Sequence, residues 1–292
     1  MIKKLYKYLT KHKWELGFLE NNIDNLLNGE KPKVWWVQHD YKDRWFADPF
    51  ILSVDNKKIE LLVEEYYDPI ERGRIARLII DKNSHRIVKI IPILELDSHL
   101  SFPAIIRKNN KIFIYPENSS GEGLNLYEFD INNNCCNKID NISDLPLTDA
   151  IIRTCNSEDF LFSTYLPTQN GNELTIYKKT VNGKYQEVQI IHFDENLARM
   201  AGDFFYVGDD LYRPAQESNF TYGHSISLQK VNFQNEKFSM SEVVRIDSPH
   251  PIHKLGFHTF NVYDDTIVVD VKGFRRPFWG KICYWVKGLF LK

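Results

Sequence analysis

Short apolar segments that begin beside an acidic residue, a proline or a glycine recur at intervals of about 50 residues along the chain. The most regular lie at 47–52, 102–107, 149–154, 201–207 and 256–262. A polar turn separates each of them from a second apolar segment, and most units contain a third and a shorter fourth. Such a period, with up to four strands in each unit, is typical of the blades of a β-propeller. The sequence therefore predicts an all-β fold, a five-bladed β-propeller.

The ring of blades needs one more strand to close. The fifth unit lacks an outer strand, whereas a strand-like segment, KVWWVQH at 33–39, precedes the first unit. An open sheet edge exposes unpaired N–H and C=O groups, so we expect residues 33–39 to close the ring by joining the fifth blade. A parallel α/β fold is disfavoured because the helices that must connect parallel strands are absent from the pattern. A two-sheet sandwich is the structural alternative.

Both ends of the chain are basic, although the net charge is only −2. Residues 1–13 contain five lysines and no acid, and residues 271–292 contain six lysines or arginines and no acid. We expect three parts: a basic N-terminal segment at 1–30, the propeller at 31–271 and a basic amphipathic helix at 272–292. The apolar face of that helix has helical spacing and is formed by Phe274, Phe278, Ile282, Trp285 and Leu289.

A basic helix with aromatic residues on its apolar side is suited to the interface of a membrane that contains anionic lipid. Ile2, Leu5 and Leu9 give the N-terminal segment a weaker face of the same kind. The alternative is that both ends dock on the propeller and leave their lysines in solvent. We expect an anionic membrane surface or a lipid-linked acceptor as a partner. Nucleic acid is not expected, because the acidic body would repel a phosphate polymer.

The sequence also favours a reducing compartment. Its four cysteines include an adjacent pair and no CxxC motif, which argues against a disulfide framework and against a zinc knuckle. The N-terminal residues lack the apolar core of a signal peptide, and no apolar run is long enough to span a bilayer. We therefore expect a cytoplasmic protein that lies against the inner face of the cell membrane.

The innermost strands of a propeller run along a central channel, so residues at their starts converge at one mouth, where a ligand of modest size can bind. The candidates come from these starts and from the ends of the second strands: Asp48, Glu65, His99, Glu117, Asp149, Asp203, Arg213, Gln216, Glu217 and His258. Several carboxylates around one funnel are suited to sugar chemistry, where they accept hydroxyl hydrogen bonds and act as acid and base. The alternative is that they cap turns and bind backbone N–H groups.

Other chemistries are less well supported. The histidines of HPIHKLGFH, His250, His253 and His258, do not have the spacing of a ligand pair on one helix, so we expect no metal. GEG at 121–123 and NGN at 170–172 are hairpin turns rather than phosphate loops, because no helix follows either. No cofactor is expected.

A series of short motifs in a fixed order carries a resemblance to a known family. The motifs are WFADPFIL, LLVEEY with GRIA, HLSFPAII, IYPENS with LYEF, DA at 149–150, RMAGDFF, LYRPAQES with YG, and GFHTFN. The set resembles the N-terminal propeller domain of plant glucosamine inositolphosphorylceramide transferases and its bacterial relatives, over residues 30–271. That family is in turn similar to the five-bladed arabinanases, levansucrases and invertases.

The resemblance to those enzymes implies roles for particular residues. The Asp-Pro of blade one would make Asp48 the base or nucleophile, and Asp149 of blade three would tune the acid. The acid of blade four would be Glu217 or Asp203. The plant proteins carry their transferase chemistry in a separate C-terminal domain, and the bacterial relatives are associated with surface-polysaccharide synthesis. The resemblance therefore implies a carbohydrate ligand.

Together these observations predict a carbohydrate-active protein of cell-surface polysaccharide or glycolipid synthesis. We expect a sugar transferase at the cytoplasmic membrane surface, with a sugar or nucleotide sugar as ligand. In that reaction Asp48 would be the base, Arg213 and His258 would hold the donor, and Glu117 would orient the acceptor. The alternatives are a sugar-binding module without catalysis and a glycoside hydrolase of the arabinanase or invertase type.

Overall fold

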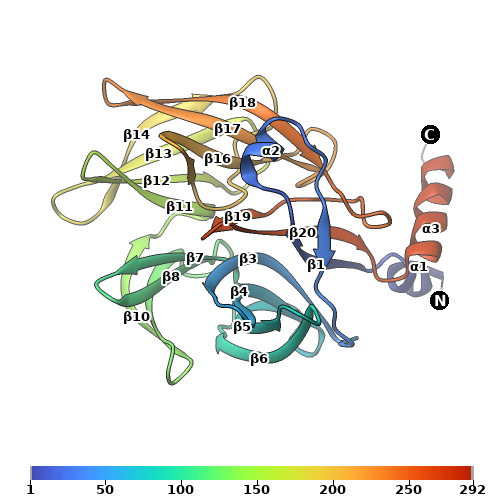
Figure 1. Cartoon of the computed structure of the whole chain (residues 1–292). Coiled ribbons are helices and arrows are strands. Elements are labelled where there is room, and N and C mark those ends of the chain that lie inside the picture. Colours follow the sequence, from blue (N-terminus) through green and yellow to red (C-terminus); the bar gives the residue numbers. More distant parts are fainter. Residues whose placement is uncertain (1, 291–292) are drawn as a thin grey trace.

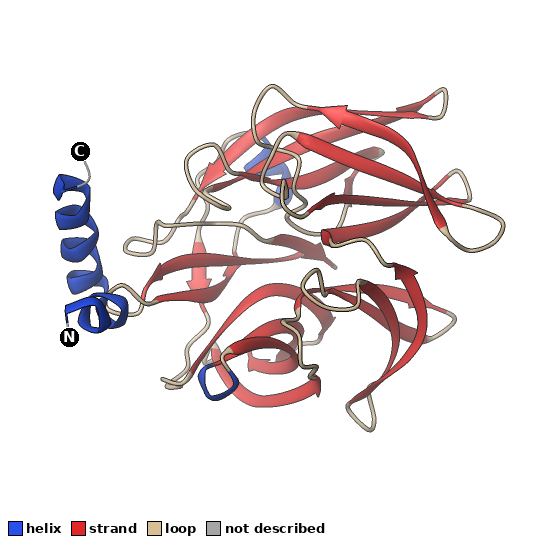
Figure 2. Cartoon of the chain, turned by 180° about the vertical axis from the view of Figure 1, so that it is seen from behind, coloured by secondary structure: helices blue, strands red, loops and turns tan. Residues whose placement is uncertain are grey.

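The computed structural model describes residues 2–290, and the side chains of residues 5–284. It contains five sheets, each of four antiparallel strands, arranged as blades around a central channel (Figure 1). Strands make up nearly all of the regular structure, and the few helices lie outside the blades (Figure 2). The prediction of a five-bladed β-propeller is confirmed.

Within each blade the strands follow one another from the channel outward. Blade one contains β3 (Arg44–Val54), β4 (Lys58–Tyr67), β5 (Arg72–Asp81) and β6 (Arg86–Leu94). Blade two contains β7 (Ser101–Lys108), β8 (Lys111–Glu117), β9 (Leu124–Asp130) and β10 (Cys135–Ser143). Blade three contains β11 (Leu147–Cys155), β12 (Glu158–Tyr165), β13 (Glu173–Lys179) and β14 (Tyr185–His192). Blade four contains β15 (Phe205–Val207), β16 (Asp210–Glu217), β17 (Ser225–Gln234) and β18 (Lys237–Asp247).

Blade five joins the two ends of the chain. Its inner strands are β19 (Phe260–Tyr263) and β20 (Thr266–Phe274), and its outer strands are β1 (His12–Leu19) and β2 (Val34–Trp36). The segment at 33–39 therefore does join the fifth blade, as its outermost strand. The predicted boundary places residues 1–30 outside the propeller, whereas the structure has a strand there, β1. This strand pairs with β20 from end to end. Two strands rather than one close the ring, and the propeller begins at residue 12.

The composition of β1 explains its position. Leu16 and Phe18 are buried in a cluster that also contains Phe46 and Leu61 of blade one, so this strand seals the joint between the last blade and the first. Between them, Gly17 lies where a Cβ atom would be only 2.6 Å from Cγ1 of Val34. The missing side chain lets β2 approach β1 closely.

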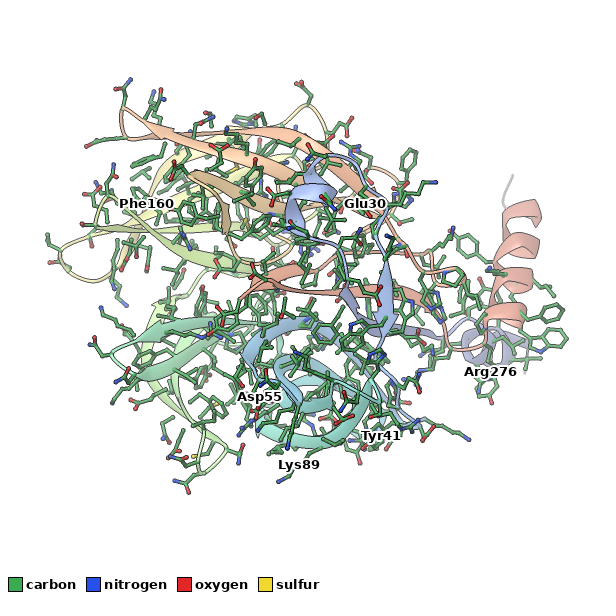
Figure 3. All side chains as sticks on the ribbon, in the orientation of Figure 1. Glu30, Tyr41, Asp55, Lys89, Phe160 and Arg276 are labelled. Atoms are coloured by element: carbon green, nitrogen blue, oxygen red, sulfur yellow. The ribbon has the colours of Figure 1, made fainter. Side chains whose placement is uncertain are left out.

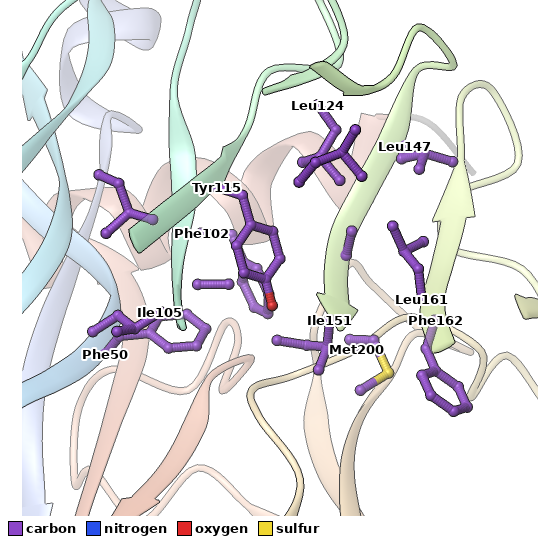
Figure 4. Close-up of a cluster of buried hydrophobic side chains, with 14 of the residues drawn as sticks. Phe50, Phe102, Ile105, Tyr115, Leu124, Leu147, Ile151, Leu161, Phe162 and Met200 are labelled. Carbon is purple, nitrogen blue, oxygen red and sulfur yellow. The ribbon is translucent and has the colours of Figure 1, made fainter. Parts of the chain in front are cut away.

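Apolar side chains fill the joints between the other blades. Figure 4 shows part of one such cluster, in which Phe50 and Phe102 of blades one and two lie beside Tyr115 and residues of blade three. The buried Tyr115 hydroxyl accepts a hydrogen bond from the N–H of Ile152 at 3.0 Å. Each large apolar side chain buried in this way stabilises the fold by roughly 1.5–3 kcal/mol. Hydrophobic packing between blades, rather than within them, holds the ring together.

The helices lie mostly at the edge of blade five. α1 (Ile2–Leu9) and α3 (Pro277–Phe290) are neighbours there (Figures 1 and 2), while α2 (Ile23–Leu27) connects β1 to β2 and a short 3-10 helix (Asp68–Ile70) follows β4. The strand β20 continues through Phe274, so the C-terminal helix begins at Pro277 rather than at residue 272. Of the expected apolar face, the side chains of Trp285 and Leu289 lie outside the described part. No helix of the described residues is long and apolar enough to cross a membrane.

The role of β1 in closing the ring can be tested with Phe18→Ala. Because Phe18 is only 1% exposed, its truncation should lower the free energy of unfolding by about 3–5 kcal/mol. Leu5→Ala, at a residue of the same N-terminal region that is 56% exposed, is the control and should change it by about 0.5 kcal/mol or less. Urea unfolding followed by tryptophan fluorescence measures both. Equal, small effects would mean that β1 is dispensable for the ring.

Candidate functional site

A cavity of about 450 Å³ opens at one mouth of the central channel, and we call it the funnel. All five blades, with the loops that join their strands, contribute to its wall. The lining residues are Trp14, Trp45, Asp48, Glu64, Tyr66, His99, Ser101, Glu117, Thr148, Leu166, Gln169, Asn170, Arg199, Tyr222 and His258. Of the candidates from the sequence, Asp48, His99, Glu117 and His258 therefore meet in one cavity.

Three inner strands bend at equivalent positions beside the funnel. Asp48, Phe102 and Asp149 have left-handed backbone conformations, with φ of +49°, +45° and +46°. The pairing of each inner strand with its second strand shifts at the same point. Such conformations are unfavourable for residues that carry a Cβ atom, so they persist only where the surroundings fix them.

Carboxylates fix these bends by accepting their backbone N–H groups. Asp270 of blade five accepts the N–H of Asp48 at 2.9 Å, and Asp48 in turn accepts the N–H of Phe102 at 3.0 Å. Glu117 of blade two accepts the N–H of Asp149 at 2.9 Å. Each acid therefore ties the blade that carries it to the next one, which gives these residues a structural role in addition to any contact with a ligand.

His258 lies between two of these acids. Its Nδ1 atom is 2.8 Å from Asp270 Oδ1, its Nε2 atom is 3.5 Å from Asp48 Oδ1, and its ring stacks on Trp14 at 3.7 Å. Burial alone would lower the pKa of His258, but the charges of Asp270 and Asp48 raise it above its usual value. Burial raises the pKa of Asp48 well above its usual value, against the pull of His258. Since Asp48 Oδ1 also accepts the Thr259 hydroxyl at 3.0 Å, both of its oxygens are engaged.

Elsewhere in the lining, Arg199 joins two carboxylates. Its Nε atom donates to Asp149 Oδ2 at 2.6 Å, its Nη2 atom is 3.5 Å from Glu117 Oε2, and its Nη1 atom donates to Asn170 at 3.0 Å. Burial, and then the charge of Asp149, raise the pKa of Glu117 to about 7, against the pull of Arg199. Glu117 thus lines the funnel as a carboxyl group that changes protonation near neutral pH. That property suits a general acid or base.

A histidine and a buried glutamate form the third polar group of the funnel. The N–H of Gly73 donates to Nδ1 of His99 at 3.0 Å, so the neutral ring carries its proton on Nε2, which lies 3.1 Å from Glu64 Oε1. A Cβ atom at residue 73 would be 2.4 Å from the carbonyl oxygen of Leu100, so glycine is needed for this approach. Burial would lower the pKa of His99, but the charge of Glu64 raises it.

Aromatic rings complete the wall. Trp45 and Tyr66 stack almost in parallel at 4.8 Å, and the ring of Tyr222 lies 4.9 Å from the Arg199 guanidinium. Flat apolar faces beside charged hydrogen-bonding groups match the two surfaces of a sugar ring, its C–H face and its hydroxyl edge. The funnel can therefore accept a carbohydrate of modest size.

Six of the predicted residues do not line the funnel, and two of these six are paired away from it. Glu65 is fully buried and accepts hydrogen bonds from Arg44 at 2.6 Å and Arg74 at 2.7 Å. Arg213 is also fully buried, donating to Gln229 Oε1 at 2.8 Å and to the carbonyl oxygen of Leu197 at 3.2 Å, and its burial lowers its pKa to about 9. Arg213 is therefore not available to hold a donor, contrary to the prediction.

The remaining candidates lie behind the wall or beside it. Gln216 donates to Asp149 Oδ2 at 2.6 Å, so these two residues form a layer just behind Glu117. Glu217 accepts the N–H of Asn219 at 2.7 Å, lies 3.1 Å from His224 Nδ1 and does not line the funnel. Asp203 is also outside the funnel lining, and burial raises its pKa to about 6. The blade-four acid implied by the resemblance is thus absent from the cavity.

Sequence reasoning missed several lining residues. Arg199 and Tyr222 lie in the motifs RMAGDFF and YG, but they precede or interrupt the strands, so the rule that strand starts converge did not select them. Asn170 belongs to the NGN turn at 170–172, and assigning this segment to a hairpin turn gives no sign that its side chain lines a cavity. Trp14 was missed because β1 was not predicted. Arg199 could be recognised only from its contacts with Asp149 and Glu117, which are distant in sequence and are brought together by the fold.

Among the residues that the structure describes, two groups could hold a cation: Asp48, His258 and Asp270, and Glu15, His250 and His253. In the second group, Nδ1 of His250 accepts the N–H groups of Ile252 and His253 at 3.0 and 2.8 Å. The neutral ring therefore carries its proton on Nε2, the atom that lies 3.4 Å from Glu15, and a protonated nitrogen does not ligate a metal. In this second group, the contacts of Glu15 with the two imidazoles account for the arrangement without an ion.

Comparison with known proteins identifies relatives of this chain. Residues 36–254 match the family described as "Glucosamine inositolphosphorylceramide transferase 1, N-terminal". The glucosamine inositolphosphorylceramide transferases 1 of Oryza sativa subsp. indica and subsp. japonica are each 30% identical to it in a match of 204 residues that covers 65% of this chain. The chain spans only 27% of the length of these relatives.

Solved structures of the same fold have little sequence similarity. An α-L-arabinofuranosidase of Clostridium thermocellum is 14% identical with a TM-score of 0.50, and the match covers 76% of this chain and 80% of that one. A GH43 β-1,3-galactosidase is 8% identical with a TM-score of 0.52, and the match covers 78% of this chain and 56% of that one. At such low identity these matches establish the propeller fold alone.

The pKa of Glu117 predicts a pH-dependent effect of Glu117→Gln. As the pH rises from the usual value of 4.5 to about 7, the unfolded chain loses the proton of Glu117 before the folded protein does, so wild-type stability falls in this window. The variant has no such proton, and its stability relative to wild type should rise by on the order of 2–3 kcal/mol between these limits. Urea unfolding at several pH values measures the difference. A difference that is constant with pH would contradict the raised pKa.

Proposed function

The chain belongs to the family of the N-terminal domain of glucosamine inositolphosphorylceramide transferase 1, and on that premise we propose that it is a sugar transferase of glycolipid or cell-surface polysaccharide synthesis. The funnel binds the sugar of a nucleotide-sugar donor, and the reaction takes place at the inner face of the cell membrane. The observation that carries the proposal is a cavity that combines aromatic rings with a carboxyl group, Glu117, whose pKa is about 7.

Glu117 is the proton-transfer group in this proposal. The acceptor hydroxyl gives its proton to the Glu117 carboxylate while its oxygen forms a bond to the anomeric carbon of the donor. The bond from that carbon to the phosphate oxygen breaks, and its electron pair leaves with the phosphate. Burial and the charge of Asp149 raise the pKa of Glu117 against the pull of Arg199, and His99 lines the same cavity to bind a sugar hydroxyl. The role of base thus moves from Asp48, whose pKa burial raises well above its usual value, to Glu117, whose pKa is about 7.

The location at a membrane is supported by the helix pair α1 and α3. Large apolar side chains are exposed on both helices: Leu5, Tyr8, Phe278, Trp279, Ile282 and Tyr284. Phe278 is 68% and Trp279 is 53% exposed, although aromatic residues of this size are usually buried. Aromatic and aliphatic side chains beside lysines are typical of helices that lie in a membrane interface. A lipid-linked acceptor would then be presented beside the propeller.

A sugar-binding module without catalysis is the second candidate. The specific observation in its favour is that the carboxylates Asp48, Asp270 and Glu117 all accept backbone N–H groups. A glycoside hydrolase of the arabinanase type is less well supported, since Glu217, which would be its acid, lies outside the funnel.

The experiment is a comparison of Glu117→Gln with Glu217→Gln, using a panel of UDP-linked and GDP-linked hexoses. Calorimetry measures binding, and release of the nucleoside diphosphate measures transfer to water or to an added acceptor. We expect Glu117→Gln to bind the donor within about threefold of wild type and to lose roughly 10²–10⁴-fold in turnover. Glu217→Gln should keep wild-type turnover.

The other outcomes separate the alternatives. Binding without turnover in the wild type would favour the sugar-binding module. Full turnover by Glu117→Gln would remove Glu117 from the proton transfer. Loss of turnover in Glu217→Gln alone, with cleavage of furanoside substrates by the wild type, would favour the hydrolase.

A further inference from the structure

A second cavity, of about 900 Å³, lies where α1 ends and α3 begins, and we call it the basic cavity. Its wall is formed by β1, β2 and the chain from β2 to β3, together with the segment that joins β20 to α3. The lining residues are Tyr8, Lys11, Lys13, Glu15, Trp36, Val37, Gln38, His39, Asp40, Tyr41, Lys42, Arg44, Asp68, Arg86, Arg275 and Arg276. Figure 3 shows Arg276 at the base of the helices and Tyr41 on the same side of the propeller.

Positive charge dominates this lining, in contrast to the acidic funnel. Seven of its residues are lysines or arginines, and three are acids. Lys11 and Arg275 both bind the single carboxylate of Asp68, at 2.9 and 2.5 Å. Lys42 and Arg276 have no carboxylate partner among the described residues. The cavity therefore keeps an excess of positive charge, which an anion would balance.

The polar groups of the cavity are suited to a phosphate. The guanidinium of Arg276 is held in place by Tyr8, whose ring lies 3.5 Å from it and whose carbonyl oxygen accepts a hydrogen bond from it at 3.2 Å. A fixed guanidinium with unused donors can bind two phosphate oxygens at once. His39 also lines the cavity, and its buried Nδ1 atom has no hydrogen-bond partner in the described part of the chain.

The surroundings of the cavity favour a phosphate that belongs to a lipid. Tyr8, near the end of α1, and Arg276, just before α3, both line the cavity, and both helices carry exposed apolar side chains. Because Tyr8 is both a lining residue and one of the exposed apolar side chains, a helix pair that lies in a membrane interface would bring the cavity close to the layer of phosphates. A soluble phosphate ligand would not need apolar side chains beside its site.

We propose that the basic cavity is a binding site for the phosphate headgroup of an anionic lipid, engaged while the helix pair lies in the membrane interface. The inference rests on the membrane location in the proposed function and adds a specific site to it. It is independent of the chemistry in the funnel. The site would fix the orientation of the propeller on the membrane.

The test compares Lys42→Gln/Arg276→Gln with the control Lys57→Gln/Lys89→Gln, which removes the same charge from exposed positions of blade one; Figure 3 shows Lys89 away from the helices. Vesicles of phosphatidylcholine contain either phosphatidic acid or phosphatidylserine, adjusted to equal surface charge. The wild type should prefer phosphatidic acid, because its phosphate is accessible. The cavity variant should bind the phosphatidic acid vesicles roughly 30-fold more weakly, since each cation contributes about 1 kcal/mol, and should lose the preference. The control should keep it.

Each other outcome has a definite meaning. Equal losses in both variants, or no preference in the wild type, would show general attraction to anionic membranes and overturn the site. Binding of inorganic phosphate or UDP through Lys42 and Arg276, with no binding to vesicles, would assign the cavity to a soluble phosphate and overturn the lipid. No vesicle binding by a wild type that still binds sugar would refute the membrane location itself. Donor binding by calorimetry, expected to be unchanged in both variants, separates this result from failure of the sugar site.

Discussion

The propeller depends on carboxylates that reach from one blade to the backbone of the next. Asp270, Asp48 and Glu117 each accept the N–H of a bent inner strand, and two of these bends place an aspartate in a left-handed conformation. Hydrophobic packing closes the joints between blades, but it is not directional. The hydrogen bonds add direction, because a charged acceptor and a buried N–H group both become costly when unpaired. In β3, β7 and β11 they fix the residue at which the strand bends beside the funnel.

The same interaction limits what these acids can do in catalysis. Asp48 accepts a hydrogen bond on each of its oxygens and lies beside His258. These contacts fix its position and leave few lone pairs for a ligand. Glu117 also uses both oxygens within the protein, for the N–H of Asp149 and for the Ser119 hydroxyl at 2.7 Å. It differs in its pKa, which lies close to neutral pH, whereas the pKa of Asp48 is raised well above its usual value. An acid that binds the backbone of the next blade can thus also be reactive, where burial and a neighbouring acid raise its pKa. An arginine then limits the increase and pairs with both carboxylates.

The sequence predicted the fold better than the site, for physical reasons. Blades are local units, so the period of apolar strands identified four of them almost completely. β1 was missed because the inner strand it extends, β20, lies more than 240 residues away, and no local pattern reports such pairing. Asp48, His99, Glu117 and His258 were found because strand ends converge in any propeller. Arg213 was placed wrongly because a strand position does not reveal which face a side chain occupies, and here it is the buried one.

The unpredicted strand β1 also connects the two cavities. Successive side chains of a strand point to opposite faces, and β1 uses this alternation: Trp14 lines the funnel, whereas Lys13 and Glu15 line the basic cavity. β3 begins in a similar way, with Arg44 in the basic cavity and Trp45 in the funnel. The basic cavity and the funnel therefore lie on two faces of the same two strands. A lipid phosphate held on one face would orient the other face, and the sugar in it, relative to the membrane.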